Sequence, residues 1–269
     1  MATSIHPTAI VDPKAKLGSD VTVGPYCVVD GDVQIGRGCR LFQGVYLTGA
    51  TQIGEDCVLH PHVIVGHEPQ DIKYDGQRTC CRIGRGTILR ENVTIHRGTA
   101  PGSSTVLGED CFLLGGSHVA HNCTLGNCVT LINNVLLGGH VTIGNHATLG
   151  GGAVVHQFVR IGEFVMISGN GRVPMDVVPF ALLEENGRIA GLNQVGIRRS
   201  GLDKNAASEI RNAYRILFER NGGTFAAAVE QLEKVANSEV EHKILAFVKE
   251  TSKRGLAGMS RDRNLGKIR

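Results

Sequence analysis

The chain has 269 residues and a formal net charge of +3 at pH 7, with a pI near 8.4. This length can bury a sizeable core in one or two domains. The charge is too small to indicate nucleic-acid binding, and no basic stripe with interleaved aromatic residues occurs, so we expect no nucleic-acid partner. No stretch approaches the roughly 18 consecutive apolar residues of a membrane span, and residues 1–11 do not resemble a signal peptide. We therefore expect a soluble, cytoplasmic protein without a membrane span.

A six-residue repeat of aliphatic side chains organises most of the chain. Ile, Leu or Val occupies every sixth position from Ile5 to Val65, from Ile83 to Ile95 and from Leu107 to Val173, always in the same phase. Chance placement would succeed at about one position in four at ordinary composition, so the repeat is not accidental. Four residues after many of these aliphatics comes a smaller apolar residue, and Gly, Asn or Asp stands nearby. These last residues tolerate the backbone angles of a corner.

A period of six fits neither an α-helix nor a lone strand, but it fits a strand, a corner and the next strand. Three such hexads make one triangular coil, so residues 18 apart stack at the strand spacing of about 4.8 Å. The sequence therefore predicts a mostly β protein whose residues 1–190 form a parallel β-helix. The repeat fails at about 67–82 and 98–105, where we expect loops that leave the prism.

After residue 202 the apolar period becomes helical. Asp203, Thr224 and Ser238 are expected to cap three successive helices, preceded by a connecting stretch through Gly191 and Gly201. The basic, Gly-containing segment Lys253–Arg269 is expected to fray. Residues 191–269 are thus predicted to form a small C-terminal α-helical domain with a basic tail.

The repeat accounts for most of the eight cysteines. Five fall on the small inward position, where a thiol is a compact hydrophobe: Cys27, Cys39, Cys57, Cys111 and Cys123. Cys80 and Cys81 adjoin an interruption and Cys128 lies off the inward positions, without C-x-x-C spacing. We predict neither a disulfide nor a structural metal.

Histidines gather in the coils that follow the first loop, at His96, His118, His121, His140, His146 and His156. His96, His118, His121 and His140 are expected to face outward, because none occupies an inward position of the repeat, and His121 and His140 are expected on adjacent coils. Three such imidazoles can bind zinc, or one can act as a general base on a hydroxyl or an amine. Solvated corner histidines are a third interpretation, and the periodicity does not choose among them.

Several segments resemble those of the UDP-N-acetylglucosamine O-acyltransferases, a hexapeptide-repeat acyltransferase family. They are Q-D-I-K-Y (Gln70 to Tyr74), I-H-R-G-T (Ile95 to Thr99), H-V-A-H-N-C-T-L-G (His118 to Gly126), G-G-H-V-T-I-G (Gly138 to Gly144), H-Q-F (His156 to Phe158) and I-R-N-A-Y (Ile210 to Tyr214). The resemblance covers nearly the whole chain and implies a left-handed β-helix. It also implies transfer of a 3-hydroxyacyl chain from acyl carrier protein to the 3-hydroxyl of UDP-N-acetylglucosamine, the first step of lipid A biosynthesis. A homotrimer that needs no metal or redox cofactor is implied too.

The same resemblance implies individual roles. His121 matches the general base, and Gly139 matches the residue whose backbone N–H stabilises the oxyanion. Positions that bind the substrates are matched by Gln70, Asp71, Lys73, His118, His140, His156, Gln157, Asn193, Arg198 and Arg199. Gly169 matches a position that sets acyl length, and a glycine there implies a long chain.

One residue departs from the family pattern. The family commonly has Asp directly after the base, where this chain has Asn122. An amide can fix an imidazole tautomer, but it cannot stabilise imidazolium as a carboxylate does. Either another acid serves this purpose, or His121 is a weaker base than usual.

Three other functions compete with O-acyl transfer. The first is an N-acyltransferase acting on a 3-amino sugar nucleotide, and the second is a zinc hydratase of the γ-carbonic anhydrase type. The third is a scaffold without catalysis, against which the polar loop around Asp71 argues. For the acyltransferase, Arg211, Arg215 and Arg220 are candidates for steering an acidic acyl carrier protein, or they simply form a solvated helix face.

Overall fold

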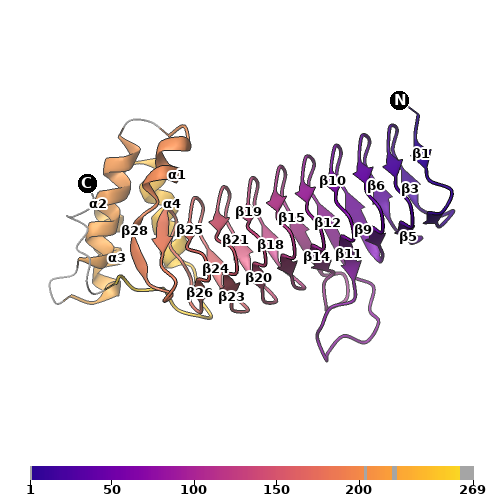
Figure 1. Cartoon of the computed structure of the whole chain (residues 1–269). Helices are drawn as coiled ribbons and strands as arrows, with labels where there is room; N and C mark the ends of the chain where they lie inside the picture. The colour runs from indigo at the N-terminus through magenta and orange to yellow at the C-terminus, as the bar shows by residue number, and fades with distance from the viewer. Residues whose placement is uncertain (1, 203–204, 220–222, 261–269) are drawn as a thin grey trace.

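The computed structural model describes residues 2–202, 205–219 and 223–260. Short parallel strands wind into a prism, and helices gather at the end opposite the first strand (Figure 1). The prediction of a parallel β-helix of hexapeptide repeats followed by a helical region is confirmed.

Three sheets form the faces of the prism, and successive strands join them in turn. The first sheet contains β1 (Ser4–Ile5), β4 (Thr22–Val23), β7 (Arg40–Leu41), β10 (Val58–Leu59), β13 (Ile88–Leu89), β16 (Phe112–Leu113), β19 (Thr130–Leu131), β22 (Thr148–Leu149), β25 (Met166–Ile167), β27 (Ala181–Leu183) and β28 (Ile189–Leu192). The second contains β2 (Ile10–Val11), β5 (Val28–Val29), β8 (Tyr46–Leu47), β11 (Ile64–His67), β14 (Thr94–His96), β17 (His118–Val119), β20 (Leu136–Leu137), β23 (Val154–Val155) and β26 (Arg172–Val173). The third contains β3 (Lys16–Leu17), β6 (Gln34–Ile35), β9 (Ala50–Ile53), β12 (Cys80–Ile83), β15 (Ser104–Leu107), β18 (Thr124–Leu125), β21 (Thr142–Ile143) and β24 (Arg160–Ile161).

The six-residue repeat fills the interior of the prism. Leu131 in β19 and Val129, two residues before it, are both fully buried. Strands one coil apart pair in parallel, as Thr130 does with Thr148, so the aliphatic side chains stack in columns. Corners between faces use left-handed backbone angles, such as the φ of 60° at Asn134, which Asn tolerates well.

The first coil departs from the expected burial. Ile5 is 46% exposed, although it opens the repeat and matches the inward positions of later coils. A coil shields its neighbour's interior, and among the described residues no coil precedes β1. The repeat therefore predicts the direction of a side chain, whereas burial requires a coil on both sides.

Both loops are shorter than predicted. β11 extends to His67 and β12 begins at Cys80, so the first loop spans residues 68–79, and the second spans residues 97–103 before β15. β12 pairs over four residues with β9 and β15, which buries Cys81 in the interior. In Figure 1 the first loop projects below the prism, next to β11.

All eight cysteines are free, and the five predicted at inward positions are buried.

In its described residues, the C-terminal region contains four helices rather than three: α1 (Gln194–Arg199), α2 (Ala206–Phe218), α3 (Phe225–Val235) and α4 (Glu239–Lys249). Thr224 and Ser238 cap α3 and α4 with their side chains, as predicted. Asp203, the third predicted cap, lies outside the described residues, and the residue that precedes α2 is Asn205. The short helix α1 was missed because six residues cannot display a helical period. The proposed domain boundary at residues 190 and 191 falls inside β28, which pairs antiparallel with β27.

The predicted fraying of the tail is wrong for residues 253–260. The Gly255 carbonyl accepts from the Asp176 N–H (2.8 Å), and the Ser260 N–H donates to the Ile189 carbonyl (2.8 Å). These bonds dock the strand-like segment after α4 onto the end of the prism, where we call residues 252–260 the C-terminal strap. Residues 261–269 lie outside the described part of the chain. Among the helices that the structure describes, none combines the length and apolar content that a bilayer crossing requires.

Candidate active site

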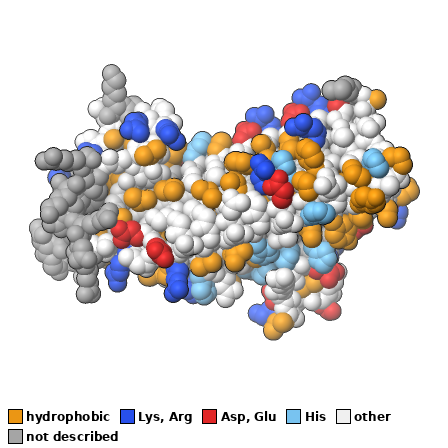
Figure 2. Space-filling view, viewed as in Figure 1, with side chains coloured by type: hydrophobic (Ala, Val, Ile, Leu, Met, Phe, Trp, Pro, Cys, Tyr) orange, Lys and Arg blue, Asp and Glu red, His pale blue; other side chains and the backbone are white. Residues whose placement is uncertain are grey.

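Corners that follow strands of the second sheet carry most of the predicted site residues. β14, β17, β20 and β23 stack in register, so the turns after them form a column along one edge of the prism. His121 and His140 stand one coil apart in this column, with ring centroids 5.2 Å apart and planes at 89°. Figure 2 shows histidine side chains gathered where the first loop leaves the prism. We call this edge the histidine corner.

The imidazole of His121 is held through its Nδ1 atom. Nδ1 lies 2.9 Å from the side-chain oxygen of Asn122 and 2.9 Å from the Thr99 hydroxyl. The Thr99 backbone N–H also donates to Asn122 Oδ1 (3.1 Å), which fixes the orientation of that amide. An amide oxygen only accepts, so Nδ1 carries the ring proton and Nε2 carries the lone pair. The Nε2 atom is therefore the basic atom of this ring.

A carboxylate from the first loop approaches that basic atom. Asp71 Oδ2 lies 3.8 Å from His121 Nε2, and the two side chains are 22% and 13% exposed. The other oxygen, Oδ1, accepts from the Lys73 backbone N–H (3.0 Å). The base of the loop is tied down by Arg97, which donates to the Tyr74 hydroxyl (2.7 Å) and the Gly66 carbonyl (2.9 Å). The loop thus brings a residue 50 positions away in sequence to the histidine corner.

Gly139 lies directly against the His121 ring. A Cβ at this position would stand 2.6 Å from both Cε1 and Nε2 of the ring, so any larger residue would displace the imidazole. The preceding carbonyl, that of Gly138, accepts from the buried thiol of Cys123 (3.2 Å) and therefore points into the prism. In a trans peptide the next N–H points the opposite way. The Gly139 N–H is consequently directed outward, beside the imidazole.

Two further histidines surround His121 with lowered pKa values. Burial, followed by the proximity of His121, lowers the pKa of His118, whose Nδ1 lies 2.7 Å from the Thr94 hydroxyl. Burial, then His121 and then Lys253 lower the pKa of His140, while Asp71 opposes the shift. Both rings therefore favour the neutral form, which donates and accepts hydrogen bonds.

His96 is a correction to the sequence analysis, which expected it to face outward. It is only 8% exposed, and within the described residues its Nδ1 has no hydrogen-bond partner. His67 pairs with it across β11 and β14, and the His118 ring stands 4.8 Å away. Burial, reinforced by these neighbouring histidines, lowers the pKa of His96 to about 4. The repeat missed this because β14 continues one residue past its aliphatic position.

On the side of His140, the histidine corner lies next to the C-terminal strap. His140 stacks on Phe158 (centroids 4.7 Å apart), and Lys253 Nζ lies 4.5 Å from the centre of the Phe158 ring. His156 and Gln157, in the same turn as Phe158, are exposed. Gln70 and Lys73 in the first loop are exposed as well. Sequence reasoning assigned no role to Thr94, Thr99, Phe158 or Lys253, although Thr99 and Phe158 stood in the quoted I-H-R-G-T and H-Q-F segments.

The remaining predicted residues lie elsewhere on the chain. Asn193 and Arg199 line a different cavity with His146 and Phe164, next to α1. The Asn193 amide caps α1 by accepting from the Gly196 N–H (2.9 Å) and donates to the Phe164 carbonyl (2.8 Å). Arg198 is exposed and does not line this cavity.

Gly169 occupies a third place, in the turn after β25. Arg172 and Glu184 line the same surface hollow. A Cβ on Gly169 would meet only the Gly151 carbonyl oxygen, at 3.5 Å, so this position has room for a larger side chain. One chain therefore does not gather all the predicted site residues at one point.

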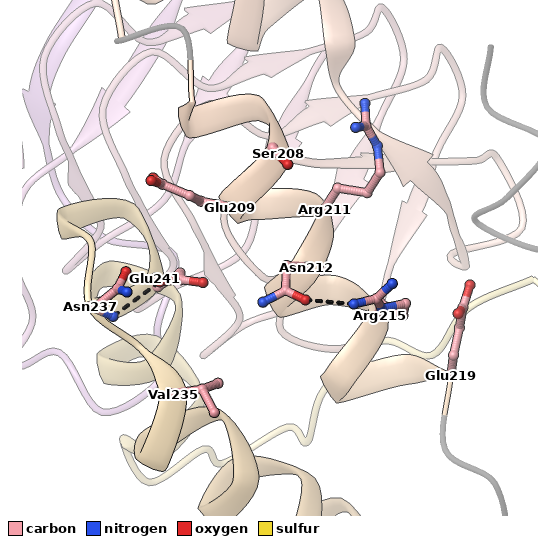
Figure 3. A pocket seen from close by; sticks show the side chains of 9 residues that line it. All are labelled: Ser208, Glu209, Arg211, Asn212, Arg215, Glu219, Val235, Asn237 and Glu241. Carbon is pink, nitrogen blue, oxygen red and sulfur yellow. Dashed lines mark hydrogen bonds between the residues drawn. The ribbon is translucent and has the colours of Figure 1, made fainter.

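A further cavity lies among the helices (Figure 3). It is lined by Ser208, Glu209, Arg211, Asn212, Arg215, Glu219, Val235, Asn237 and Glu241. Arg215 donates to the Asn212 side chain (2.8 Å), and Figure 3 shows Arg211 directed away from that pair. Carboxylates line the cavity alongside these arginines, so its charge is mixed rather than basic. Arg220 lies outside the described residues.

The zinc hypothesis finds no support in this geometry. Across the described ranges, no group of three or more His, Cys, Asp or Glu side chains is arranged to hold a metal ion.

The prism of hexapeptide repeats is the fold of the hexapeptide-repeat transferase class, and two family models match the chain. Residues 14–49 match the family model of bacterial transferase hexapeptide repeats. Residues 176–257 match that of the second domain of UDP-N-acetylglucosamine O-acyltransferase.

Similar proteins and solved structures identify the family within this class. The acyl-[acyl-carrier-protein]–UDP-N-acetylglucosamine O-acyltransferase of Rhizobium johnstonii is 38% identical over 96% of this chain and 95% of its own length. That of Brucella ovis is 40% identical over 94% and 91%. The UDP-N-acetylglucosamine acyltransferase structure from Campylobacter jejuni superposes with a TM-score of 0.90 at 36% identity, covering 96% of this chain and 100% of that one. This chain belongs to the UDP-N-acetylglucosamine O-acyltransferase family.

Proposed function

We propose that this protein transfers a 3-hydroxyacyl chain from acyl carrier protein to the 3-hydroxyl of UDP-N-acetylglucosamine, the first step of lipid A biosynthesis. The observation that carries the proposal is the His121 imidazole, whose Nδ1 proton is fixed by Asn122 Oδ1 at 2.9 Å. Its Nε2 lone pair is thereby available beside the outward N–H of Gly139. The names of the relatives supply the acceptor and the donor class.

In the proposed reaction, the sugar hydroxyl oxygen attacks the thioester carbonyl carbon while His121 Nε2 takes the hydroxyl proton. The carbonyl oxygen gains negative charge, which the Gly139 N–H stabilises. The carbon–sulfur bond then breaks, and the imidazolium returns the proton to the departing thiolate. A thioester is already activated, so the scheme needs no metal or redox cofactor. The neutral forms of His118 and His140, favoured by their lowered pKa values, suit hydrogen bonding to sugar hydroxyls.

The separation of the predicted residues supports a homotrimer with sites between neighbouring prisms. Arg199 and Asn193 line a cavity beside α1, apart from the histidine corner. A second copy that placed this cavity against the histidine corner would bring both groups to one substrate. Arginine suits a diphosphate because its planar fork of donors is always charged. Arg198 and Gln157 would then contact the nucleotide or pantetheine portions, and Gly169 would leave the acyl groove open.

Mixing two inactive variants tests this arrangement. H121A and R199A are expected to be nearly inactive alone, and activity should return when the two chains are co-expressed and assemble together. Light scattering should give the mass of three chains. Mixed assemblies that stay inactive would contradict shared sites, because each trimer would still pair an intact corner with an intact arginine.

Acyl transfer from a panel of 3-hydroxyacyl carrier proteins to UDP-N-acetylglucosamine and to its 3-amino analogue tests the reaction itself. We expect the hydroxyl acceptor to react and the longer chains to be preferred. Faster transfer to the amine would instead support the N-acyltransferase alternative. H121A should lower kcat by about 10²- to 10⁴-fold with unchanged thermal unfolding, as loss of a general base does. Near-normal turnover would remove His121 from this role.

Acyl carrier protein is the proposed macromolecular partner, and the cytoplasm is the proposed location. Arg211 and Arg215 on α2 are available for the carrier, although Glu209 and Glu219 line the same cavity. The expected docking contribution of these arginines is therefore modest, and exchanging both for Gln should change the KM for the carrier by only a few-fold.

A further inference from the structure

The Nδ1 side of His121 offers only neutral partners. Asn122 Oδ1 and the Thr99 hydroxyl are each 2.9 Å from Nδ1, and neither bears a charge. Proton transfer to Nε2 makes the ring an imidazolium, whose positive charge these groups stabilise only as dipoles. Replacing the orienting carboxylate of a catalytic histidine by an amide costs up to about 10⁴-fold in kcat in other enzymes. This site therefore needs a negative charge from another direction.

Titratable groups approach His121 from four elements. His96 ends β14, His118 begins β17, and His140 lies in the turn after β20; each adds positive charge when protonated. The fourth element is the first loop, which contributes Asp71. Among the described residues, Asp71 is the only carboxylate within ion-pair distance of His121, with Oδ2 3.8 Å from Nε2.

The loop holds Asp71 in this position. One carboxylate oxygen accepts from the Lys73 N–H (3.0 Å), and the Asp71 carbonyl accepts from the Tyr74 N–H (2.9 Å). Arg97 anchors Tyr74 in turn. With one oxygen used inside the loop, the other is left facing the imidazole. Asp71 is 22% and His121 is 13% exposed, so water screens this pair less than a surface ion pair.

We propose that Asp71 supplies the negative charge that stabilises the His121 imidazolium, in place of the carboxylate that Asn122 does not provide. The inference deepens the proposed function and rests on it. The two residues then have separate roles. Asn122 fixes the tautomer of His121 through Nδ1, and Asp71 stabilises the positive charge that appears on the ring when Nε2 takes the proton. Asp71 thus acts on turnover through His121, besides any contact with the sugar.

A double-mutant cycle in steady-state kinetics tests the proposal with the full-length protein. D71N keeps an oxygen for the Lys73 N–H but removes the charge, and we expect kcat to fall about 10- to 100-fold. N122D puts a carboxylate on the Nδ1 side. In the N122D background, D71N should lower kcat only about threefold, so the double variant should recover about 3- to 30-fold over D71N alone.

The matched control is N134D. Asn134 has the same backbone φ of 60° as Asn122 and occupies an exposed corner outside the site, so this exchange adds an equal charge at an equivalent turn. N134D should leave kcat of the wild type unchanged and should not rescue D71N. If N134D restored the kcat of D71N, the effect of Asp71 would come from the net charge of the protein rather than from its position, and the proposal would be overturned. Thermal unfolding of every variant should match that of the wild type within a few degrees.

Two kinetic results separate a charge partner from a residue that only binds sugar. If Asp71 only contacts the sugar, D71N raises the KM for UDP-N-acetylglucosamine, and its effect on kcat is the same whether position 122 is Asn or Asp. The inference would be overturned if D71N lowered kcat by the same factor in both backgrounds, or if D71N changed only KM. Failure of the proposed function looks different, because the wild type itself would then transfer no acyl group to this acceptor.

Discussion

Gly139→Ala is the sharpest test of the histidine corner, because the structure sets the size of the disturbance. The new Cβ would stand 2.6 Å from His121 Nε2 and Cε1, so the ring must move about 0.8 Å to reach an ordinary contact of 3.4 Å. The backbone at position 139 is not among those with positive φ, so the substitution acts by contact rather than by backbone strain. The shift pulls Nδ1 from Asn122 Oδ1, which lies 2.9 Å away.

Displacement of a reacting group by about 1 Å costs about 10²-fold in rate, and overpacking costs about 1–3 kcal/mol in stability. We therefore expect G139A to lower kcat about 10²-fold while the protein stays folded. The assay is acyl transfer at saturating concentrations of both substrates, alongside thermal unfolding. G115A is the control, because its Cβ would meet the end of the exposed Asn133 side chain at 3.2 Å and the Glu91 carbonyl at 3.5 Å. A G139A enzyme that keeps kcat within threefold of the wild type would refute the reasoning.

Three further predictions follow from the same contacts. Gly169→Met should shift the preferred acyl chain to shorter lengths without lowering kcat for the best chain. The position has room for the larger side chain, because a Cβ there meets only the Gly151 carbonyl oxygen at 3.5 Å. An unchanged preference in the panel of acyl carrier proteins would contradict this prediction. His96 has a pKa of about 4 in the folded chain and about 6.5 unfolded, so its stabilising effect is complete above pH 6.5 and is lost as the pH falls toward 4. Between pH 7 and pH 5 the wild type should lose about 2 kcal/mol of unfolding free energy that His96→Gln does not lose, as measured with denaturant; equal losses would exclude His96 as the source. Lys253→Gln should raise the pKa of His140 in an NMR titration, because the Lys253 charge lowers it, and Lys249→Gln, whose ammonium pairs with Glu233, is the control.

The interior of the prism was determined by the sequence at the level of single side chains. Leu113, Val119 and Leu125 follow one another at the six-residue spacing, and each is at most 2% exposed. Local chemistry also placed the helix starts, since Thr224 and Ser238 each accept from a backbone N–H three residues later. These features are predictable because each depends on residues close in the chain: a hexad reports which face a side chain takes, and a cap satisfies its own helix.

The histidine corner was only partly predictable. The phase of the repeat turned His118, His121 and His140 outward, but it did not reveal that Thr99 and Asn122 share the Nδ1 atom of His121. His96 was placed on the wrong side of the burial boundary, because its environment comes from strands on the coils above and below it.

The coil pattern and the helix caps were thus written in the sequence, whereas the position of the first loop and the C-terminal strap was decided by the tertiary structure. Asp71 reaches His121 only because Arg97 and Tyr74 anchor the loop, and Lys253 reaches Phe158 only because Asp176 and Ile189 bond to the strap. A repeat determines which way side chains face within a few residues, whereas the position of a loop depends on partners tens of residues away in the chain. The charges around the imidazole are set by those distant partners, which no local pattern records.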